Sequence, residues 1–157
     1  MSGTVSGVQS VVVRHPVAAD EANWRRLWAG YNDFYNADVP DEVTSYTWRR
    51  VLDPASDVFG LVAEVDGQLA GMALCVAHEG TWSLSKLCYL EDLFVDPSVR
   101  GAGVARAIMD HLVALCEANG WSDLYWHTRD TNAAARRLYD SYVKVDDHVR
   151  YRMELNR

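Results

Sequence analysis

The sequence predicts a mixed α/β fold in one domain, with a central sheet covered by helices on both faces. Apolar, β-branched runs of strand length alternate along the chain with amphipathic segments whose apolar residues lie three and four positions apart. The length of 157 residues is that of a single domain. We expect a flexible leader over residues 1–10 and the domain over residues 11–157.

The first part of the chain predicts one short strand and two helices. Val11–Val13 is a β-branched run that ends before a proline, and Asp20 is expected at the N-cap of the first helix. The second helix is expected from Asp38-Val39-Pro40 to a stop before Asp53-Pro54. The apolar face of the first helix carries Trp24, Leu27, Trp28, Tyr31 and Phe34 or Tyr35.

The middle of the chain predicts a hairpin and a further strand. Phe59–Val65 and Gln68–Ala77 are apolar runs joined by Asp66-Gly67, a dipeptide that favours a two-residue hairpin turn. Cys88–Val95 is the next expected strand, and it ends at Asp96-Pro97.

The last part predicts two helices and three extended segments. The longer helix covers Gly101–Asn119, with Gly120 as its C-terminal cap. A shorter helix is expected over Asn132–Ser141. The extended segments are Leu124–Thr128, Val143–Asp146 and Val149–Leu155.

Composition and charge exclude several classes of protein. The hydrophobic fraction is 49%, and no apolar run approaches the ~18 residues of a membrane span. A formal net charge of −7 argues against a generic nucleic-acid binder. The three cysteines form no CxxC pair and the five histidines have no metal-ligand spacing, so we expect a cytoplasmic protein without a metal.

The most informative segment is the glycine loop from Asp96 to Arg106, between a predicted strand and a predicted helix. Glycines admit close approach of a ligand to the backbone, and the free N–H groups at a helix start favour an anion such as pyrophosphate. The dinucleotide fingerprint fails because Arg106 occupies its third glycine position, and no Gly-Lys-Ser/Thr of a P-loop follows.

Three motifs in this half resemble those of the GNAT N-acetyltransferase superfamily. They are the loop Arg100-Gly101-Ala102-Gly103-Val104-Ala105, the preceding strand Tyr89–Pro97, and the helix Asn132–Tyr139, which is similar to Asn-x-x-Ala-x-x-Leu-Tyr. The branch that holds small histone, polyamine and thialysine acetyltransferases looks closest. The glycine that many members carry about four residues after the Leu-Tyr motif is missing here.

The resemblance implies a mostly antiparallel sheet with a splayed cleft, acetyl-CoA as cosubstrate, and a homodimer. It also implies the residues that contact acetyl-CoA. These are Phe94, Val95, Arg100, Gly101, Ala102, Gly103, Val104, Ala105, Asn132 and Arg136.

Acetyl transfer to an amine needs a group that takes the ammonium proton and benefits from one that protonates the departing thiolate. Glu91 and Asp92 are the base candidates, and strand alternation predicts that at most one faces the cleft. By resemblance we expect Glu91 to be the base and Tyr139 the acid. The acceptor site is expected to include Tyr31, Tyr35, Trp82, Glu91 and Asp92.

The leading interpretation is an acetyl-CoA-dependent N-acetyltransferase that uses direct attack in a ternary complex. The acceptor is expected to be a small cationic amine, polyamine or lysine-like, because the chain is acidic and its arginines gather in the presumed cofactor half. The alternatives are a protein or peptide lysine acetyltransferase and a non-catalytic acyl-CoA-binding module. No nucleic acid and no membrane is expected as a partner.

Overall fold

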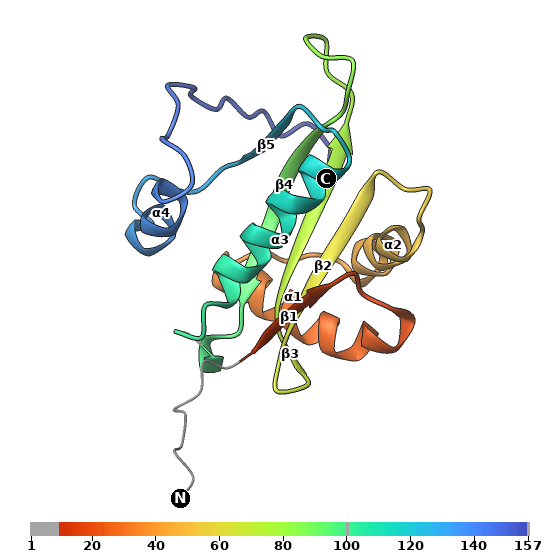
Figure 1. The fold of residues 1–157 in the computed structure, drawn as a ribbon. Helices are drawn as coiled ribbons and strands as arrows, with labels where there is room; N and C mark the ends of the chain where they lie inside the picture. The colour runs from red at the N-terminus through yellow and green to blue at the C-terminus, as the bar shows by residue number, and fades with distance from the viewer. Residues whose placement is uncertain (1–9, 100, 157) are drawn as a thin grey trace, which may run out of the picture. The chain divides into compact units, whose positions relative to one another are not determined.

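The computed structural model describes residues 10–99 and 101–156, which form two compact units that meet in sequence at His127 and Thr128 (Figure 1). Each unit is treated by itself below. The first unit contains the sheet and most helices, and the second contains the last helix. The elements are β1 Val11–Arg14, the 3-10 turn η1 Ala18–Asp20, α1 Glu21–Phe34, α2 Asp41–Leu52, β2 Val58–Val65, β3 Gln68–His78, β4 Leu87–Val95, the 3-10 turn η2 Pro97–Val99, α3 Val104–Ala118, β5 Asp123–Trp126 and α4 Ala133–Asp140.

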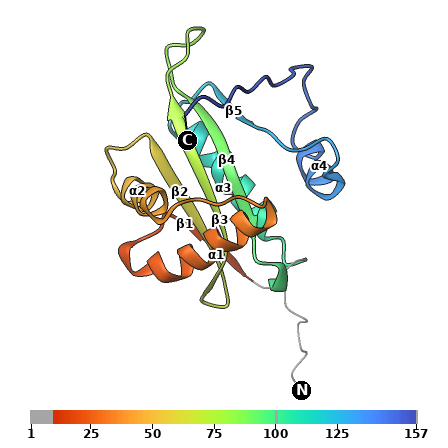
Figure 2. The ribbon, with the colours of Figure 1, turned by 180° about the vertical axis from the view of Figure 1, so that it is seen from behind.

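The sheet has five strands in the order β1-β2-β3-β4-β5. Neighbours from β1 to β4 are antiparallel, and β4 and β5 are parallel because α3 connects them. Helix α3 packs across one face of the sheet, whereas α1 lies over β3 and β4 and α2 over β2 on the other face (Figures 1 and 2). The predicted mixed α/β fold is confirmed.

The core under α1 and α2 is built on tryptophans. The rings of Trp24 and Trp28 stack with centroids 5.8 Å apart, and Trp48 of α2 lies 4.9 Å from Trp24. The indole N–H of Trp28 donates to the Thr44 hydroxyl at 3.0 Å, so the polar atom of this buried ring is satisfied. The predicted apolar face of the first helix is confirmed for Trp24, Leu27 and Trp28, which are buried, and Tyr31 and Tyr35 are partly buried. Phe34 is 60% exposed and does not belong to the buried face.

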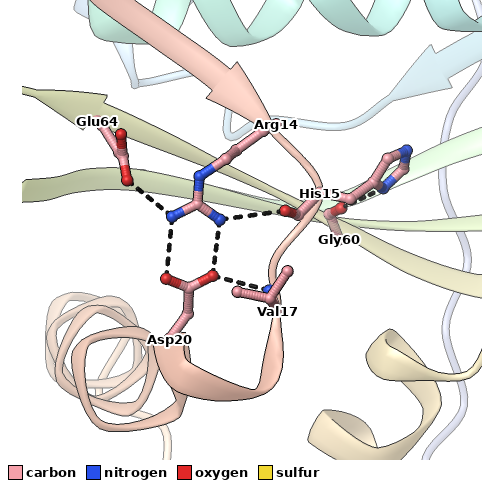
Figure 3. A network of polar contacts seen from close by, with 6 residues as sticks. All are labelled: Arg14, His15, Val17, Asp20, Gly60 and Glu64. Carbon is pink, nitrogen blue, oxygen red and sulfur yellow. Dashed lines mark hydrogen bonds and ion pairs between the residues drawn. The ribbon is translucent and has the colours of Figure 1, made fainter. Parts of the chain in front are cut away.

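Arg14 joins β1 to the start of α1 and to β2 (Figure 3). Its guanidinium donates to both carboxylate oxygens of Asp20, at 2.7 and 3.0 Å, and to Glu64 at 2.7 Å. Asp20 also accepts the Val17 N–H at 2.8 Å. The hydrogen bonds from Arg14 lower the pKa of Asp20 below its usual range. Asp20 is the N-cap residue of α1, as predicted, but its carboxylate binds Arg14 and the N–H of Val17 before η1 rather than the N–H groups of the helix.

Two turns follow the sequence prediction and one helix start does not. Asp66 and Gly67 both have positive φ, 52° and 76°, which is the geometry of the expected two-residue hairpin. Gly120 follows α3 with φ of 68°, as expected for a C-terminal cap. Helix α3 begins at Val104 rather than Gly101, because Gly103 takes a left-handed conformation that a helix interior does not allow.

The two last predicted strands are wrong. The segments Val143–Asp146 and Val149–Leu155 form no strand in the described structure. Alternating apolar residues favour an extended chain, but a strand requires a neighbouring backbone that pairs with it. Between the two segments the Asp146 carboxylate accepts the His148 N–H at 3.1 Å, a local turn that competes with ladder pairing. Most of the leader expected over residues 1–10 lies outside the described residues.

Among the residues that the structure describes, no helix is long and apolar enough to cross a membrane.

Candidate active site

A bulge at Glu91 marks the place where β4 and β5 separate. The residues on either side of it, Leu90 and Asp92, pair with consecutive residues of β3, so Glu91 is an extra residue in the ladder. The pairing of β4 with β5 extends as far as Leu90 and Trp126. Strand β4 continues to Val95 along β3 alone. The pairing of β4 with β5 therefore ends beside the bulge, and the splayed cleft that the resemblance implies stays a prediction.

The bulge turns Asp92 toward α1. Asp92 pairs with Leu74, which belongs to the apolar cluster under α1 and α2. The Tyr31 hydroxyl on α1 donates a hydrogen bond to the Asp92 carboxylate. Burial raises the pKa of Asp92 to about 6, the hydrogen bond from Tyr31 opposes the shift, and the charge of Glu91 adds to it. Asp92 is thus a charged, half-buried carboxylate at neutral pH.

Burial and the neighbouring charge of Asp92 also raise the pKa of the Tyr31 hydroxyl, which therefore remains a proton donor in this pair. The Tyr31 ring stacks on Trp28 with centroids 5.5 Å apart and lies 4.8 Å from Tyr35. Phe94 meets Tyr31 edge-on at 6.4 Å. The structure thus brings three of the predicted acceptor residues, Tyr31, Tyr35 and Asp92, into one continuous group.

The other predicted acceptor residues lie differently. Glu91 is exposed at the bulge, between Asp92 and the end of the β5 pairing. Trp82 is fully exposed in the loop between β3 and β4, so it does not pack against the Tyr31–Asp92 pair. Simple strand alternation predicts that Glu91 and Asp92 point to opposite faces of the sheet. That rule does not apply to this segment, because a bulge interrupts the alternation of side chains.

The predicted glycine loop has the local geometry of an anion cradle. Gly101 and Gly103 have positive φ, 87° and 74°, and a Cβ added at either position would meet nothing within 4 Å. The backbone N–H of Ala107 is bonded to Gly103, so the N–H groups of Val104 and Ala105 belong to the first turn, which has no carbonyl of its own helix to bond. Open space, left-handed glycines and a helix start fit the pyrophosphate of acetyl-CoA.

Ala102, between the two glycines of this loop, and Val95, which precedes the loop, are both partly buried. Arg100, which was also predicted there, lies outside the described residues.

The remaining predicted residues belong to the second unit. Asn132 caps α4, since its side-chain oxygen accepts the Ala135 N–H at 3.2 Å. The Arg136 guanidinium donates to the Asp130 carbonyl at 3.1 Å. Tyr139 is half-buried near the end of the same helix. Asn132 and Tyr139 are two turns apart on α4, as expected.

One group of aromatic side chains on this part of the sheet is absent from the predicted site residues. The rings of His78, Tyr89, Tyr125 and His127 lie together on β3, β4 and the end of β5, and we call them the aromatic shelf. Strand alternation could have shown on which face of the sheet Tyr89 lies. It could not have shown which rings lie beside Tyr89, because that depends on the register between three strands. No group of three or more metal-ligating side chains is found in the described part of the chain.

Residues 24–142 match the family described as "Acetyltransferase (GNAT) family". The chain belongs to the GNAT acetyltransferase family. It is 29% identical over 144 residues to the D-amino-acid N-acetyltransferase HPA3 of Saccharomyces cerevisiae, a match that covers 90% of this chain and 89% of that protein.

Two further relatives are named as acetyltransferases of other amines. The chain is 33% identical over 89 residues to thialysine N-epsilon-acetyltransferase of Caenorhabditis elegans, covering 57% of this chain and 55% of that protein. It is 30% identical over 150 residues to aminoglycoside N(6')-acetyltransferase type 1 of Stenotrophomonas maltophilia, covering 91% and 93%.

The fold is also shared with solved structures. A ribosomal-protein-alanine N-acetyltransferase from Brucella melitensis biovar Abortus superimposes with a TM-score of 0.76 at 22% identity, covering 94% of this chain and all of that one. Family membership and these relatives together identify the chain as an acetyl-CoA-dependent N-acetyltransferase.

Proposed function

We propose that this protein transfers the acetyl group of acetyl-CoA to a primary amine of a small cationic acceptor, polyamine or lysine-like, by direct attack in a ternary complex. The observation that carries this proposal is the pair of carboxylates, Glu91 and Asp92, at the point where β4 and β5 separate. No Lys or Arg occurs within β3, β4 or β5. The local field of this part of the sheet therefore favours a cation.

On the cosubstrate side, the proposed contacts come from the splayed strand and the glycine loop. The backbone of Phe94 and Val95 would meet the pantetheine arm, and the loop from Gly101 to Ala105 would hold the pyrophosphate through its N–H groups. From the other unit, Asn132 would bond the pantetheine amide and Arg136 a phosphate. Arg100 completes the predicted set through its position in the sequence motif.

On the acceptor side, Asp92 would bind the incoming ammonium and Glu91 would remove its proton through a water molecule. The support is that Asp92 is held by Tyr31 on the α1 side, whereas Glu91 is exposed beside it. The neutral amine nitrogen then attacks the thioester carbonyl carbon, so that a C–N bond forms and the C–S bond breaks. Tyr139 would supply the proton that the departing thiolate takes up, and the second proton that the nitrogen loses as the amide forms would restore the Tyr139 hydroxyl through water.

Direct attack is also favoured by where the cysteines lie. Cys88 forms hydrogen bonds with Cys75 and with Cys116 of α3, which places this group on the α3 face of the sheet. Asp92 and Tyr31 lie on the opposite face. A covalent acetyl-cysteine would therefore form on the wrong side of the sheet for an amine bound at Asp92.

We further propose a homodimer and a cytoplasmic location. The C-terminal segment exposes Val149, Tyr151, Met153 and Leu155, an alternating apolar set suited to pairing with a second copy. Three free cysteines are in keeping with a reducing compartment. Size measurement by light scattering, before and after removal of the residues following Asp147, tests the dimer: loss of the dimer on truncation supports the proposal, and a wild-type monomer contradicts it.

The acceptor proposal is tested with a panel of amines under one assay of thiol release from acetyl-CoA. Putrescine and lysine are compared with ethanolamine, which has a neutral far end, and with γ-aminobutyrate, which has an anionic one. D-Lysine and D-alanine are included because a relative is a D-amino-acid N-acetyltransferase. We expect the dications to have the highest kcat/KM and their KM to rise with salt, since screening weakens attraction to the carboxylates.

Glu91→Gln is the matched variant in this panel, because it keeps the side-chain shape and removes the charge. It is expected to lower kcat for putrescine and to flatten the rise of activity with pH. A preference for γ-aminobutyrate or D-alanine that salt does not alter would overturn the cationic acceptor, although the chain would remain an N-acetyltransferase.

A further inference from the structure

The aromatic shelf is a continuous group of four rings contributed by three strands. Tyr89 and Tyr125, cross-strand partners on β4 and β5, stack with centroids 5.0 Å apart and an interplanar angle of 19°. His127 stands nearly perpendicular to both, at 5.5 Å from Tyr89 and 6.2 Å from Tyr125. His78 of β3 contacts Tyr125 edge-on at 5.7 Å.

A hydrogen bond fixes the orientation of Tyr125 in this group. The Tyr125 hydroxyl lies 2.7 Å from Nε2 of His78, and Nδ1 of His78 lies 2.8 Å from the Glu79 carbonyl oxygen. A carbonyl oxygen can only accept, so Nδ1 carries a proton, and Nε2 of the neutral ring accepts from the Tyr125 hydroxyl. The Tyr125 ring is thus held in place by a polar contact on its edge and by stacking on Tyr89 on one face, and it is still 36% exposed.

The shelf lies on the same face of the sheet as Asp92. Cys88 precedes Tyr89 and points to α3, so Tyr89 points to the opposite face. That is the face on which α1 lies over β3 and β4 and α2 lies over β2. Tyr89 pairs with Val76 and Asp92 pairs with Leu74, two residues away along β3. The spacing of these positions along the strand is therefore about 7 Å.

The chemistry around the shelf selects a cation. The charged residues within β3, β4 and β5 are Glu91, Asp92 and Asp123, all acidic. Within the first unit, the basic residue nearest to the shelf in sequence is Lys86, which is bonded to Asp57 at 2.7 Å; Arg129 of the second unit follows His127 by two positions. Tyrosine faces attract ammonium groups, and adjacent carboxylates add to that attraction. Part of the shelf is accessible, since Tyr125 is 36% exposed and His127 is exposed.

We propose that the aromatic shelf binds the far ammonium group of the acceptor while its reacting amine lies at Glu91 and Asp92. This inference rests on the proposed function and adds the residues that set specificity. The spacing along β4 favours an acceptor whose two nitrogens are separated by a flexible chain of about four carbons, the length that bridges about 7 Å. Tyr125 and His127 act in binding, and His78 is a positioning residue for Tyr125.

The test compares two acceptors of the same shape. One is N,N,N-trimethylputrescine, and the other is its neutral isostere in which carbon replaces the quaternary nitrogen. Wild-type protein is expected to have the lower KM for the charged compound. Tyr125→Leu is expected to raise that KM by roughly five- to thirty-fold and to leave the KM of the isostere little changed, because the lost interaction is cation–π.

Tyr125→Phe is the matched control, since it keeps the ring and removes the hydroxyl bonded to His78; it should keep most of the preference for the cation. His127→Ala, at an exposed position, gives a second variant that does not depend on the folding of Tyr125→Leu. Equal discrimination by wild type, Tyr125→Leu and His127→Ala would overturn the proposal, and so would a wild-type preference for the neutral isostere.

Calorimetric titration of N,N,N-trimethylputrescine in the presence of CoA separates this inference from the proposed function. Weaker binding to Tyr125→Leu than to Tyr125→Phe supports the shelf whether or not turnover occurs. Acetylation of putrescine with unaltered binding by the shelf variants leaves the proposed function in place and rejects the shelf. Absence of acetylation with any amine rejects the proposed function alone.

Discussion

Two glycines at opposite ends of α3 provide a controlled test of the acetyl-CoA loop. Gly103 precedes the helix with φ of 74° and Gly120 follows it with φ of 68°, and a Cβ at either site would meet nothing within 4 Å. By helical rise they lie more than about 20 Å apart. Alanine therefore imposes the same backbone strain at both positions, but only at Gly103 does its methyl group occupy the proposed pyrophosphate site.

The strain of a left-handed alanine is about 1–2 kcal/mol. For a chain of this size, Gly103→Ala and Gly120→Ala should each lower Tm by roughly 2–8 °C, and by similar amounts. At Gly103 the methyl group also obstructs hydrogen bonds from backbone N–H groups to a phosphate, and one such bond to a charged group contributes about 1.5–3 kcal/mol. Acetyl-CoA should therefore bind Gly103→Ala roughly 10- to 150-fold more weakly than wild type.

The assay is calorimetric titration of acetyl-CoA into the three proteins, with thermal unfolding of each in parallel. Gly120→Ala should keep the wild-type affinity at the same loss of stability. Unchanged affinity of Gly103→Ala would refute the assignment of the loop. An equal loss of affinity in both variants would show that strain in α3, rather than the cradle, controls binding.

Three further predictions concern single side chains. Tyr139→Phe keeps the ring and should lower kcat by roughly 10²–10³-fold with little change in acetyl-CoA affinity; wild-type turnover would make this tyrosine structural. Asp92 loses its charge as pH falls through about 6, so the KM for putrescine should rise below that pH in wild type but not in Asp92→Asn. The same dependence of KM on pH in both proteins would contradict the binding of the ammonium group by Asp92. Because the fold lowers the pKa of Asp20, the charged carboxylate stabilises the fold fully at any pH above the ordinary aspartate pKa. This stabilisation is lost as the pH falls through the lowered pKa. Asp20→Asn should cost about 1.5–3 kcal/mol at neutral pH in urea unfolding, with a smaller difference from wild type in acid, whereas a difference independent of pH would point to packing.

The elements that the sequence predicted correctly are those with strong local signals. Trp24, Leu27 and Trp28 recur at helical spacing, and Asp66-Gly67 has the backbone freedom that a tight hairpin needs. The open glycine loop before α3 was also predictable, because glycines and the helix start are adjacent in sequence. Helix α3 spans Val104–Ala118 rather than the predicted Gly101–Asn119, and it starts later because the left-handed Gly103 lies outside the helix.

The features that were not predictable depend on pairing between distant segments. The bulge at Glu91 is a shift in register against β3, and nothing in the residues of β4 alone specifies it. That shift turns Asp92 toward Tyr31, 61 positions away in a different element, and the burial of the carboxylate there raises its pKa. The C-terminal segments failed for the complementary reason: their alternation indicates an extended chain but not a partner.

Direct transfer to an amine is tested most closely by the products formed with and without an acceptor. Acetyl-CoA is incubated with the protein alone and then with putrescine, while free thiol is measured and the intact protein and the amine are analysed by mass spectrometry. The account predicts no thiol release and no acetylated protein without the amine, and one thiol per acetylated putrescine once it is added. Thiol release with acetylated protein before the amine is present, or no release with any amine of the panel, would contradict it.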